Sequence, residues 1–287
     1  APLHFMTNGI YLMNQMSYGN FILNLGIRQE WYLDKTNYNL KNEVVTRQHK
    51  LLKRVGAIYK ASKNINAYAS YIEGFEVQTN AYLGTTAYGG PFAPMSSKMF
   101  EGGLKTEWLN GKLNASIAYF NIHQKNVLTD DPNDSNELKK QGANQRSQGV
   151  ELEVTGRILP NWQINAGYSF IDANLKENGE KYRKENTPKH SFNFWTRYDV
   201  TRGALQNFGI GIGGNYVGEK IAWIDRSLTV PSYMVVDAAV YYKLKKVQLA
   251  VNVGNVFNKT YWLGAFDYTR LFPGTPRNVM FNIKYSF

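Results

Sequence analysis

The 287-residue sequence contains no cysteine and no long run of apolar residues. Without cysteine the chain forms neither a disulfide framework nor a thiolate metal site. No window approaches the ~18 consecutive apolar residues that a membrane-spanning helix needs, which excludes a helical membrane protein. A closed β-barrel remains possible at a negative mean hydropathy, because lipid-facing and lumen-facing residues alternate along each of its strands.

Signals for secretion, catalysis and metal binding are also missing. Residues 1–5 lack the charged stretch and apolar core of a secretory signal. No nucleophile elbow, phosphate loop or zinc signature is present, so we expect no enzyme. The four histidines have no shared metal spacing, and the acidic stretch 130–137 lacks the glycine of a calcium loop. We therefore predict no metal site and a solvated loop at 130–137.

The charge balance favours anionic partners. The sequence has 33 basic and 22 acidic residues, a net charge of +11. Such a charge suits nucleic acid, an anionic membrane surface or an anionic small ligand. The charges are spread over alternate strand positions and loops, whereas a nucleic-acid module gathers them in a patch. We therefore expect no nucleic-acid partner.

The dominant pattern is alternation of apolar and polar residues over segments of ~10 to 15 residues, longer than the strands of most soluble sheets. In one segment Val150, Leu152 and Val154 alternate with Glu151 and Glu153. Twenty tyrosines, 15 phenylalanines, 6 tryptophans and 25 glycines suit the aromatic girdles and close strand pairing of a transmembrane barrel. Both observations predict an all-β, antiparallel transmembrane barrel.

This pattern predicts about thirteen strands. They are expected near residues 8–17, 20–33, 49–61, 64–74, 98–109, 111–127, 139–158, 161–175, 188–201, 204–219, 230–244, 246–257 and 278–287. Tight turns, such as Asn110-Gly111 and Arg202-Gly203, alternate with long polar connections, as in outer-membrane barrels. An odd number of strands with an unpaired first strand would leave an open edge in lipid. We therefore expect further strands upstream of residue 1.

The C-terminus resembles the sorting signal of outer-membrane barrels. An apolar row ends the chain on an aromatic residue; it comprises Phe281, Ile283, Tyr285 and Phe287. The resemblance implies that the barrel-assembly machinery reads this row. An ordinary amphipathic terminal strand would show the same alternation.

A series of short motifs resembles the TonB-dependent siderophore receptors and covers nearly the whole chain. The motifs include Gly149-Val150-Glu151-Leu152-Glu153-Val154, Asn186-Thr187-Pro188, Val230-Pro231-Ser232-Tyr233, Asn252-Val253-Gly254-Asn255-Val256-Phe257-Asn258 and Pro276-Arg277. Their order and spacing match the family throughout. No single motif is specific, but the series is.

The resemblance implies a 22-stranded barrel around an N-terminal plug, of which residues 1–287 are the C-terminal portion with the last thirteen strands. It implies a receptor in the Gram-negative outer membrane that binds and imports ferric siderophores with energy from the TonB complex, which contacts the absent plug. The siderophore is the transported ligand, and no covalent cofactor is expected. Outer-membrane lipid and lipopolysaccharide are expected neighbours, the latter from the net charge alone.

Ligand recognition in such receptors falls to extracellular loops and the plug apex, where aromatic and cationic groups hold a bulky chelate. The loop candidates in this sequence are Tyr82, Tyr88, Phe92, Trp223, Arg226, Tyr261, Trp262, Tyr268 and Arg270. Each could instead be a girdle residue or pack within its loop.

Three alternatives stay open at this point. The cargo could be haem, cobalamin or another metal chelate, although the long loops after residue 49 contain no histidine for haem. A barrel hydrolase would need a cluster of acid, base and nucleophile that the sequence does not show. A soluble β-sandwich would have shorter strands and closer turns.

Overall fold

The structure is a computed structural model, and it describes residues 2–78, 92–130, 139–177, 179–222, 228–265 and 270–287. These residues form strands and loops. The described residues contain no helix that is long and apolar enough to cross a membrane. The strands are β1 Leu3–Tyr18, β2 Phe21–Thr36, β3 Val44–Lys60, β4 Ile65–Glu76, β5 Met95–Trp108, β6 Leu113–Asp130, β7 Lys139–Leu159, β8 Trp162–Glu177, β9 Glu180–Arg183, β10 His190–Asp199, β11 Phe208–Val217, β12 Lys220–Ile221, β13 Thr229–Val230, β14 Tyr233–Leu244, β15 Val247–Gly254, β16 Trp262–Ala265, β17 Leu271–Pro273 and β18 Asn278–Tyr285.

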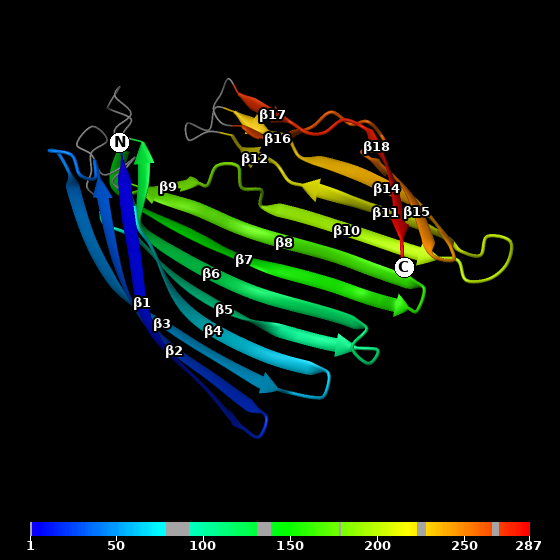
Figure 1. Cartoon of the computed structure of the whole chain (residues 1–287), viewed down its shortest axis with the longest axis horizontal. Helices are drawn as coiled ribbons and strands as arrows, with labels where there is room; N and C mark the ends of the chain where they lie inside the picture. The colour runs from blue at the N-terminus through cyan, green and yellow to red at the C-terminus, as the bar shows by residue number, and fades with distance from the viewer. Residues whose placement is uncertain (1, 79–91, 131–138, 178, 223–227, 266–269) are drawn as a thin grey trace. The chain divides into compact units, whose positions relative to one another are not determined.

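One antiparallel sheet of 14 strands contains all the long strands in chain order, with β9 attached to β8 (Figure 1). Two short hairpins, β12–β13 and β16–β17, form separate sheets. The all-β, antiparallel prediction is confirmed, and each predicted segment contains a strand. Internal contacts divide the chain into a first unit (1–103, 120–148 and 173–182) and a second unit (104–119, 149–172 and 183–287).

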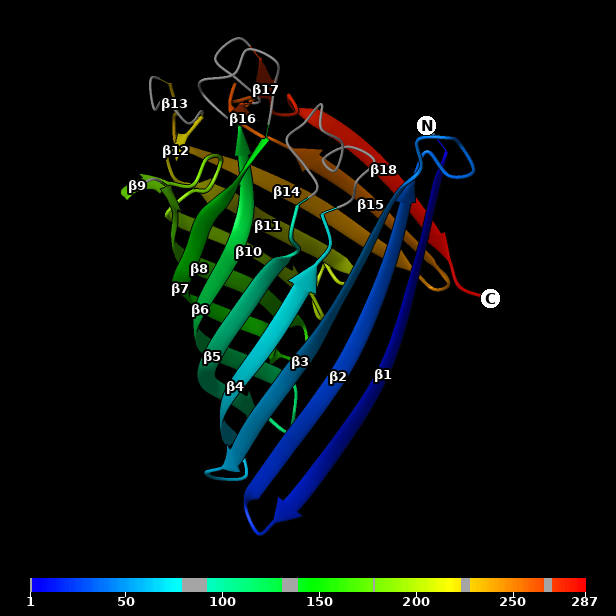
Figure 2. The ribbon, with the colours of Figure 1, turned by 90° about the vertical axis from the view of Figure 1, so that its left-hand side faces the viewer.

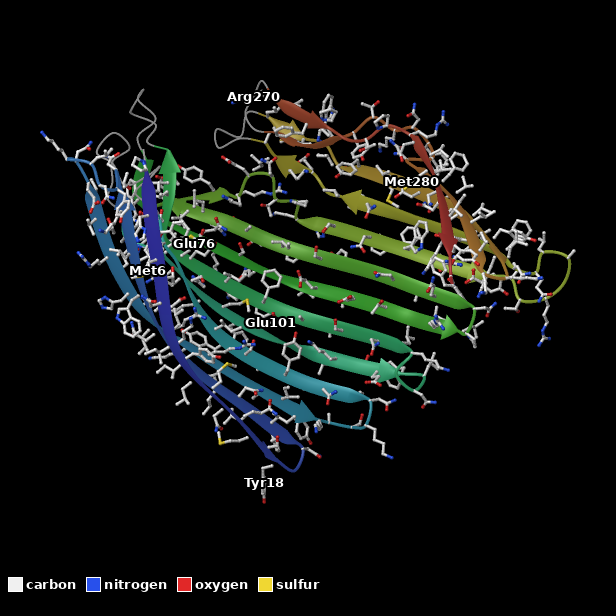
Figure 3. All side chains as sticks on the ribbon, viewed as in Figure 1. Met6, Tyr18, Glu76, Glu101, Arg270 and Met280 are labelled. Atoms are coloured by element: carbon white, nitrogen blue, oxygen red, sulfur yellow. The ribbon has the colours of Figure 1, made fainter. Side chains whose placement is uncertain are left out.

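In the first unit, β1 to β4 lie side by side (Figure 2). Directly paired residues share a face of the sheet, because side chains alternate along each strand. Phe21, Leu23, Leu25 and Ile27 of β2 therefore define a mainly apolar face with their partners on β1 and β3, of which Asn14 and Lys53 are polar. Met6 and Tyr18, labelled in Figure 3, lie on this face near the two ends of β1. Asn24, Arg28 and Glu30 define the opposite, polar face.

In the second unit the register also separates an apolar face of the sheet from a polar face. Ile210 and Ile212 of β11 pair with Val240 and Ala238 of β14, and these pair with Val251 and Val253 of β15. The row continues to Phe281, Ile283 and Tyr285 on β18. The predicted sorting-signal row therefore lies on the apolar face, and Phe287 follows with its ring 5.1 Å from that of Tyr285.

The strand boundaries differ most from the prediction at the open end of the first hairpin, at the start of β3, which begins at Val44 instead of 49, and before β11. β1 begins at Leu3 and pairs Leu3 with Thr36, so the hairpin extends beyond the expected 8–17. The pattern missed this extension because apolar residues occupy both rows there. β11 begins at Phe208 instead of 204, since backbone bonds from Gln206 to Gly203 and from Phe208 to Leu205 curl the segment into turns.

Candidate ligand-binding site

A cavity of about 760 Å³ lies in the second unit, at the end of the polar face where the long connections begin. Its floor comes from five neighbouring strands, and its side comes from the loop between β15 and β18. The lining residues are Trp195, Asn215, Val217, Tyr233, Val235, Asp237, Ala238, Asn252, Val253, Gly254, Asn255, Tyr261, Leu263, Thr275, Asn278 and Met280. Its volume is in the range of small-molecule sites, ~300 to 1,000 Å³.

Aromatic rings form two walls of this cavity. The rings of Tyr233 and Tyr261 lie 4.6 Å apart between centroids, which brings a strand end and a loop together. Trp195 lies over the backbone of β11, because Gly211 and Gly213 have no side chain to hold it off. A Cβ atom at these glycines would stand 2.6 Å and 2.4 Å from the indole ring. The glycines therefore fix Trp195 against the sheet, with its ring lining the cavity.

Most of the polar side chains that line this cavity are asparagine amides. Asn215, Asn252 and Asn278 offer donors and acceptors at the cavity surface, and Asp237 adds a carboxylate. Asp237 Oδ1 accepts a hydrogen bond from the backbone N–H of Asn255 at 2.8 Å. Farther along the same face, the Arg197 guanidinium lies 3.8 Å from the centre of the Tyr241 ring and 2.8 Å from Asp199 Oδ1.

Asn255 holds the loop that carries Tyr261. Its side chain is buried, its Nδ2 donates to the carbonyls of Lys259 (2.8 Å) and Thr275 (3.1 Å), and its Oδ1 accepts from Lys259 N (2.8 Å). Its φ of +50° is a conformation that asparagine tolerates better than most residues. The Asn255 side chain thus ties the two ends of the loop to each other, and the Asn255 backbone N–H ties the loop to Asp237 of β14.

Two further residues connect separate loops. Asn186 bonds both backbone groups of Ala265, donating from Nδ2 at 2.8 Å and accepting at Oδ1 at 3.0 Å. Its own N–H donates to Ile221 O at 2.8 Å. The Nζ of Lys220, which is buried, donates to Leu263 O. Burial lowers the pKa of Lys220. The loops before β10, β14 and β18 are therefore joined by side-chain bonds.

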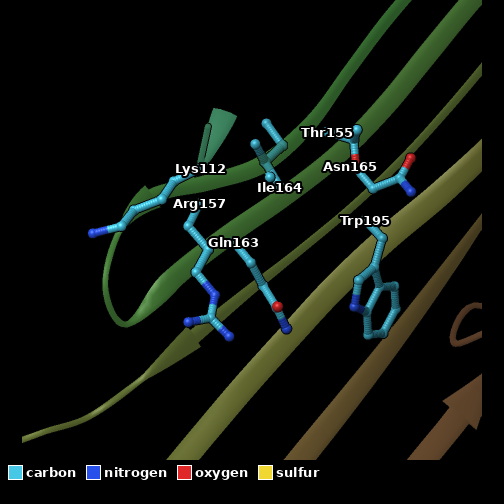
Figure 4. Close-up of a pocket in the computed structure, with 8 residues that line it drawn as sticks. Lys112, Thr155, Arg157, Gln163, Ile164, Asn165 and Trp195 are labelled. Carbon is cyan, nitrogen blue, oxygen red and sulfur yellow. The ribbon is translucent and has the colours of Figure 1, made fainter. Parts of the chain in front are cut away.

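A second cavity of about 550 Å³ lies on the polar face nearer the tight turns (Figure 4). It shares Trp195 with the first cavity, and Lys112 and Arg157 add positive charge to its lining. Arg157, Gln163 and Trp195 extend in the same direction from their strands in Figure 4. Because Trp195 belongs to both linings, the two cavities are neighbours along one wall.

The structure places the predicted loop residues in different surroundings. Tyr261 lines the first cavity, and Trp262 packs beside it against the buried cluster of Ala222, Val230 and Ala265. Arg270 is exposed. Phe92, in the first unit, is buried, and its carbonyl accepts from Gln48 at 3.1 Å. The other candidates lie outside the described residues; they are Tyr82, Tyr88, Trp223, Arg226 and Tyr268.

Sequence reasoning did not single out Trp195, Asp237, Asn252 or Lys220 as site residues. Asn186, Asn252 and Asn255 appeared only inside family-like motifs. The alternation places Trp195 and Asp237 on the polar rows, and an indole in a polar row is the signal that could have marked the site. Within the described residues no group of three metal-ligating side chains occurs. Most of the acidic stretch 130–137 lies outside them.

A sequence model of the TonB-dependent receptor-like β-barrel matches residues 3–256. The chain belongs to this family. The family resemblance read from the motifs is thereby confirmed, and members of the family are outer-membrane proteins of Gram-negative bacteria. They are receptors and transporters, not enzymes.

Relatives of the TonB-dependent receptor chain include named receptors. The metal-pseudopaline receptor of Pseudomonas aeruginosa is 31% identical over 240 residues, which are 82% of this chain and 33% of the relative. The ferripyoverdine receptor of the same species is 28% identical, covering 86% and 31%. The chain thus spans about a third of these relatives. A TonB-dependent receptor of Haemophilus influenzae is 32% identical and is covered to 79% of its length.

The fold also matches a solved member of the family. The ferripyoverdine receptor of the outer membrane of Pseudomonas aeruginosa, bound to ferripyoverdine, superposes with a TM-score of 0.84 at 28% identity. The match covers 99% of this chain and 39% of that receptor.

Proposed function

We propose that this chain is the C-terminal part of the barrel of an outer-membrane receptor that binds and imports a ferric siderophore, with energy delivered through TonB. The relatives named as a ferripyoverdine receptor and as a ferrichrome outer membrane transporter support the cargo class. On this proposal the polar face lines the lumen and the apolar face meets lipid. Segments before residue 1 supply the plug, the remaining strands of a 22-stranded barrel and the contact with TonB.

The cavity at the loop end of the polar face carries the proposal for the ligand. Its tyrosine and tryptophan rings offer stacking surface for a bulky chelate, and its asparagine amides can bond chelate carbonyl and hydroxyl oxygens. Tyr261 comes from a loop and Trp195 from the wall, so a chelate between them would contact both. The other loop candidates, including Trp262 and Arg270, remain predicted contacts.

Binding to the full-length receptor tests this assignment. The probes are iron-loaded hydroxamates and catecholates, with ferripyoverdine and ferrichrome included, followed by ⁵⁵Fe retention and uptake. Trp195→Ala and Tyr261→Ala should each weaken binding about tenfold or more, as expected for a buried aromatic contact. The matched control is Tyr216→Ala, which removes a tyrosine from the apolar face of β11. Equal loss in the control, or no loss in either site variant, would remove the cavity as the site.

A second cargo has a specific observation in its favour, because the relative named as a metal-pseudopaline receptor is 31% identical. We propose a metal chelate other than a ferric one as the alternative. The same chelators loaded with zinc, nickel or cobalt separate the two. Preference for these loads over iron would assign the receptor to the alternative class.

A further inference from the structure

The second cavity, of about 550 Å³, differs from the first cavity in charge. Lys112 and Arg157 line it, and no acidic residue is among the described residues of its lining. The described lining of the first cavity contains no lysine or arginine, and it includes the carboxylate of Asp237. An anionic ligand is therefore attracted by the lining of the second cavity and repelled by Asp237 in the first.

A close backbone contact brings the two cationic residues together. The Arg157 N–H donates to the Lys112 carbonyl at 2.7 Å, which holds β7 against the turn before β6. Gly156, with a φ of +138°, makes this approach possible, because a Cβ atom at its position would overlap the Lys112 carbonyl oxygen. A residue with a side chain at this position would push the two segments apart and separate the cations.

Neither of these two cations is neutralised within the described part of the chain. Both residues are exposed, and their side chains make no hydrogen bond or ion pair there. Two acidic side chains lie near the tight turns of the second unit. Asp199 is paired with Arg197 at 2.8 Å, and the Glu107 carboxylate lies against Gly111. The two cations are therefore available to an anion from outside the chain.

One row of the polar face connects the two cavities. The register pairs Asn165 with Trp195. Trp195 pairs with Gly213, which in turn pairs with Asp237. Asn165 lines the second cavity, Asp237 lines the first, and Trp195 lines both. At about 4.8 Å between neighbouring strands, this row is about 14 Å long. A ligand that moves from the first cavity toward the tight turns therefore reaches the second while it still contacts the indole ring.

We propose that the second cavity is a further binding site for the cargo, between the loop end and the tight turns, and that it selects anionic ferric chelates. The Arg157 guanidinium can donate two parallel hydrogen bonds to a carboxylate, and Lys112 adds a second positive charge (Figure 4). The amides of Gln163 and Asn165 can bond neutral oxygens of the chelate, and Trp195 offers a stacking surface. This assignment rests on the proposed function, in which the polar face lines the lumen.

Surface binding and uptake by cells that express the full-length receptor test the assignment. The probes are loaded with ⁵⁵Fe; ferric citrate and a ferric tris-catecholate are anionic, and ferrichrome is neutral. Retention by de-energised cells measures binding at the outer site, and accumulation by energised cells measures passage. The double variant Lys112→Gln/Arg157→Gln removes both cations. Lys243→Gln is the matched control, because Lys243 lies on the polar face of β14 near a tight turn and outside both cavity linings.

The double variant should retain the anionic chelates like the wild type and accumulate them about tenfold more slowly, as for the loss of charged hydrogen bonds. Ferrichrome accumulation should stay unchanged, and Lys243→Gln should behave like the wild type with every probe. Arg157→Lys keeps the charge without the paired geometry, so its accumulation of anionic chelates should lie between the two. Normal accumulation of anionic chelates in the double variant, or an equal loss in Lys243→Gln, would overturn the assignment.

Thiol labelling separates a ligand site from a contact with the segments before residue 1. Gln163→Cys, in a chain without cysteine, should lose reactivity toward N-ethylmaleimide while energised cells take up an anionic chelate. Unchanged labelling, with equal loss of neutral and anionic uptake in the double variant, would assign the cations to a structural contact and refute the site. A wild type that accumulates only ferrichrome refutes the second site alone. A wild type that retains no ferric chelate ends the proposed function and the second site with it.

Discussion

Replacing Asn255 by alanine should release the loop that carries Tyr261. The Asn255 side chain makes three hydrogen bonds within the loop, and alanine makes none of them. At about 1 kcal/mol net for each bond, the loss is about 3 kcal/mol, or about a hundredfold in the local opening equilibrium. Backbone strain at φ +50° adds to this for alanine. Hydrogen exchange of the Lys259 amide, followed by mass spectrometry over residues 256–265, measures the effect.

Two further variants separate the effect of the lost hydrogen bonds from the effect of backbone strain. Asn255→Gly removes the bonds but accepts the positive φ, so its exchange should fall between alanine and wild type. Asn258→Ala has the same φ of +50° and loses one bond, from Arg277 N to Asn258 Oδ1 at 2.9 Å, so about a tenfold increase is expected. Exchange in Asn255→Ala within threefold of the wild type, or no faster than in Asn258→Ala, would show that the Asn255 side chain does not hold the loop.

Three other outcomes follow from the same packing. Gly213→Ala places a Cβ atom 2.5 Å from the Phe194 carbonyl and should lower stability by about 1 to 3 kcal/mol in thermal unfolding, while Gly56→Ala, whose Cβ meets nothing closer than 3.9 Å, should not. Asn186→Ala should raise exchange at the Ala265 amide by about tenfold or more, since it leaves two backbone groups unpaired. The pKa of Lys220 is lowered, so the Lys220 amine binds a proton less tightly in the folded loop than in the unfolded loop. The stability of the folded loop should therefore rise as the pH rises toward about 10.4, the pKa of an unperturbed lysine. Maleimide labelling of an Ala222→Cys variant should therefore slow with pH relative to the same variant carrying Lys220→Met, and equal pH profiles would refute this.

The strands could be predicted from the sequence because the alternation of apolar and polar residues is a local property of each strand. Val150 to Val154 and Met234 to Tyr242 show it without tertiary help, and both segments are strands. Boundaries failed where the alternation weakens, as at residues 3–7, or where a turn contains residues that suit a strand, as at Leu205. The short hairpins β12–β13 and β16–β17 escaped because two to four residues carry no readable period.

The site was predicted less well, because it depends on contacts between distant residues. Tyr261 was a candidate from its loop, but its partner Tyr233 comes from the start of β14. Trp195 became part of a wall only through the glycines of β11, and no residue near Trp195 in the sequence indicates this. Lys220, Asn186 and Asn255 act through backbone groups, which have no sequence signature.

On the proposed function, alternate residues of the long strands face lipid. Single cysteines at positions 234 to 241 of β14, carrying nitroxide spin labels in the full-length receptor in bilayers, test it directly, and this chain has no cysteine to interfere. We expect a period of two, in which labels at Met234, Val236, Ala238 and Val240 collide frequently with dissolved oxygen and labels at the odd positions do not. Even positions shielded from both oxygen and a water-soluble nickel complex would contradict it, because they would then pack against protein.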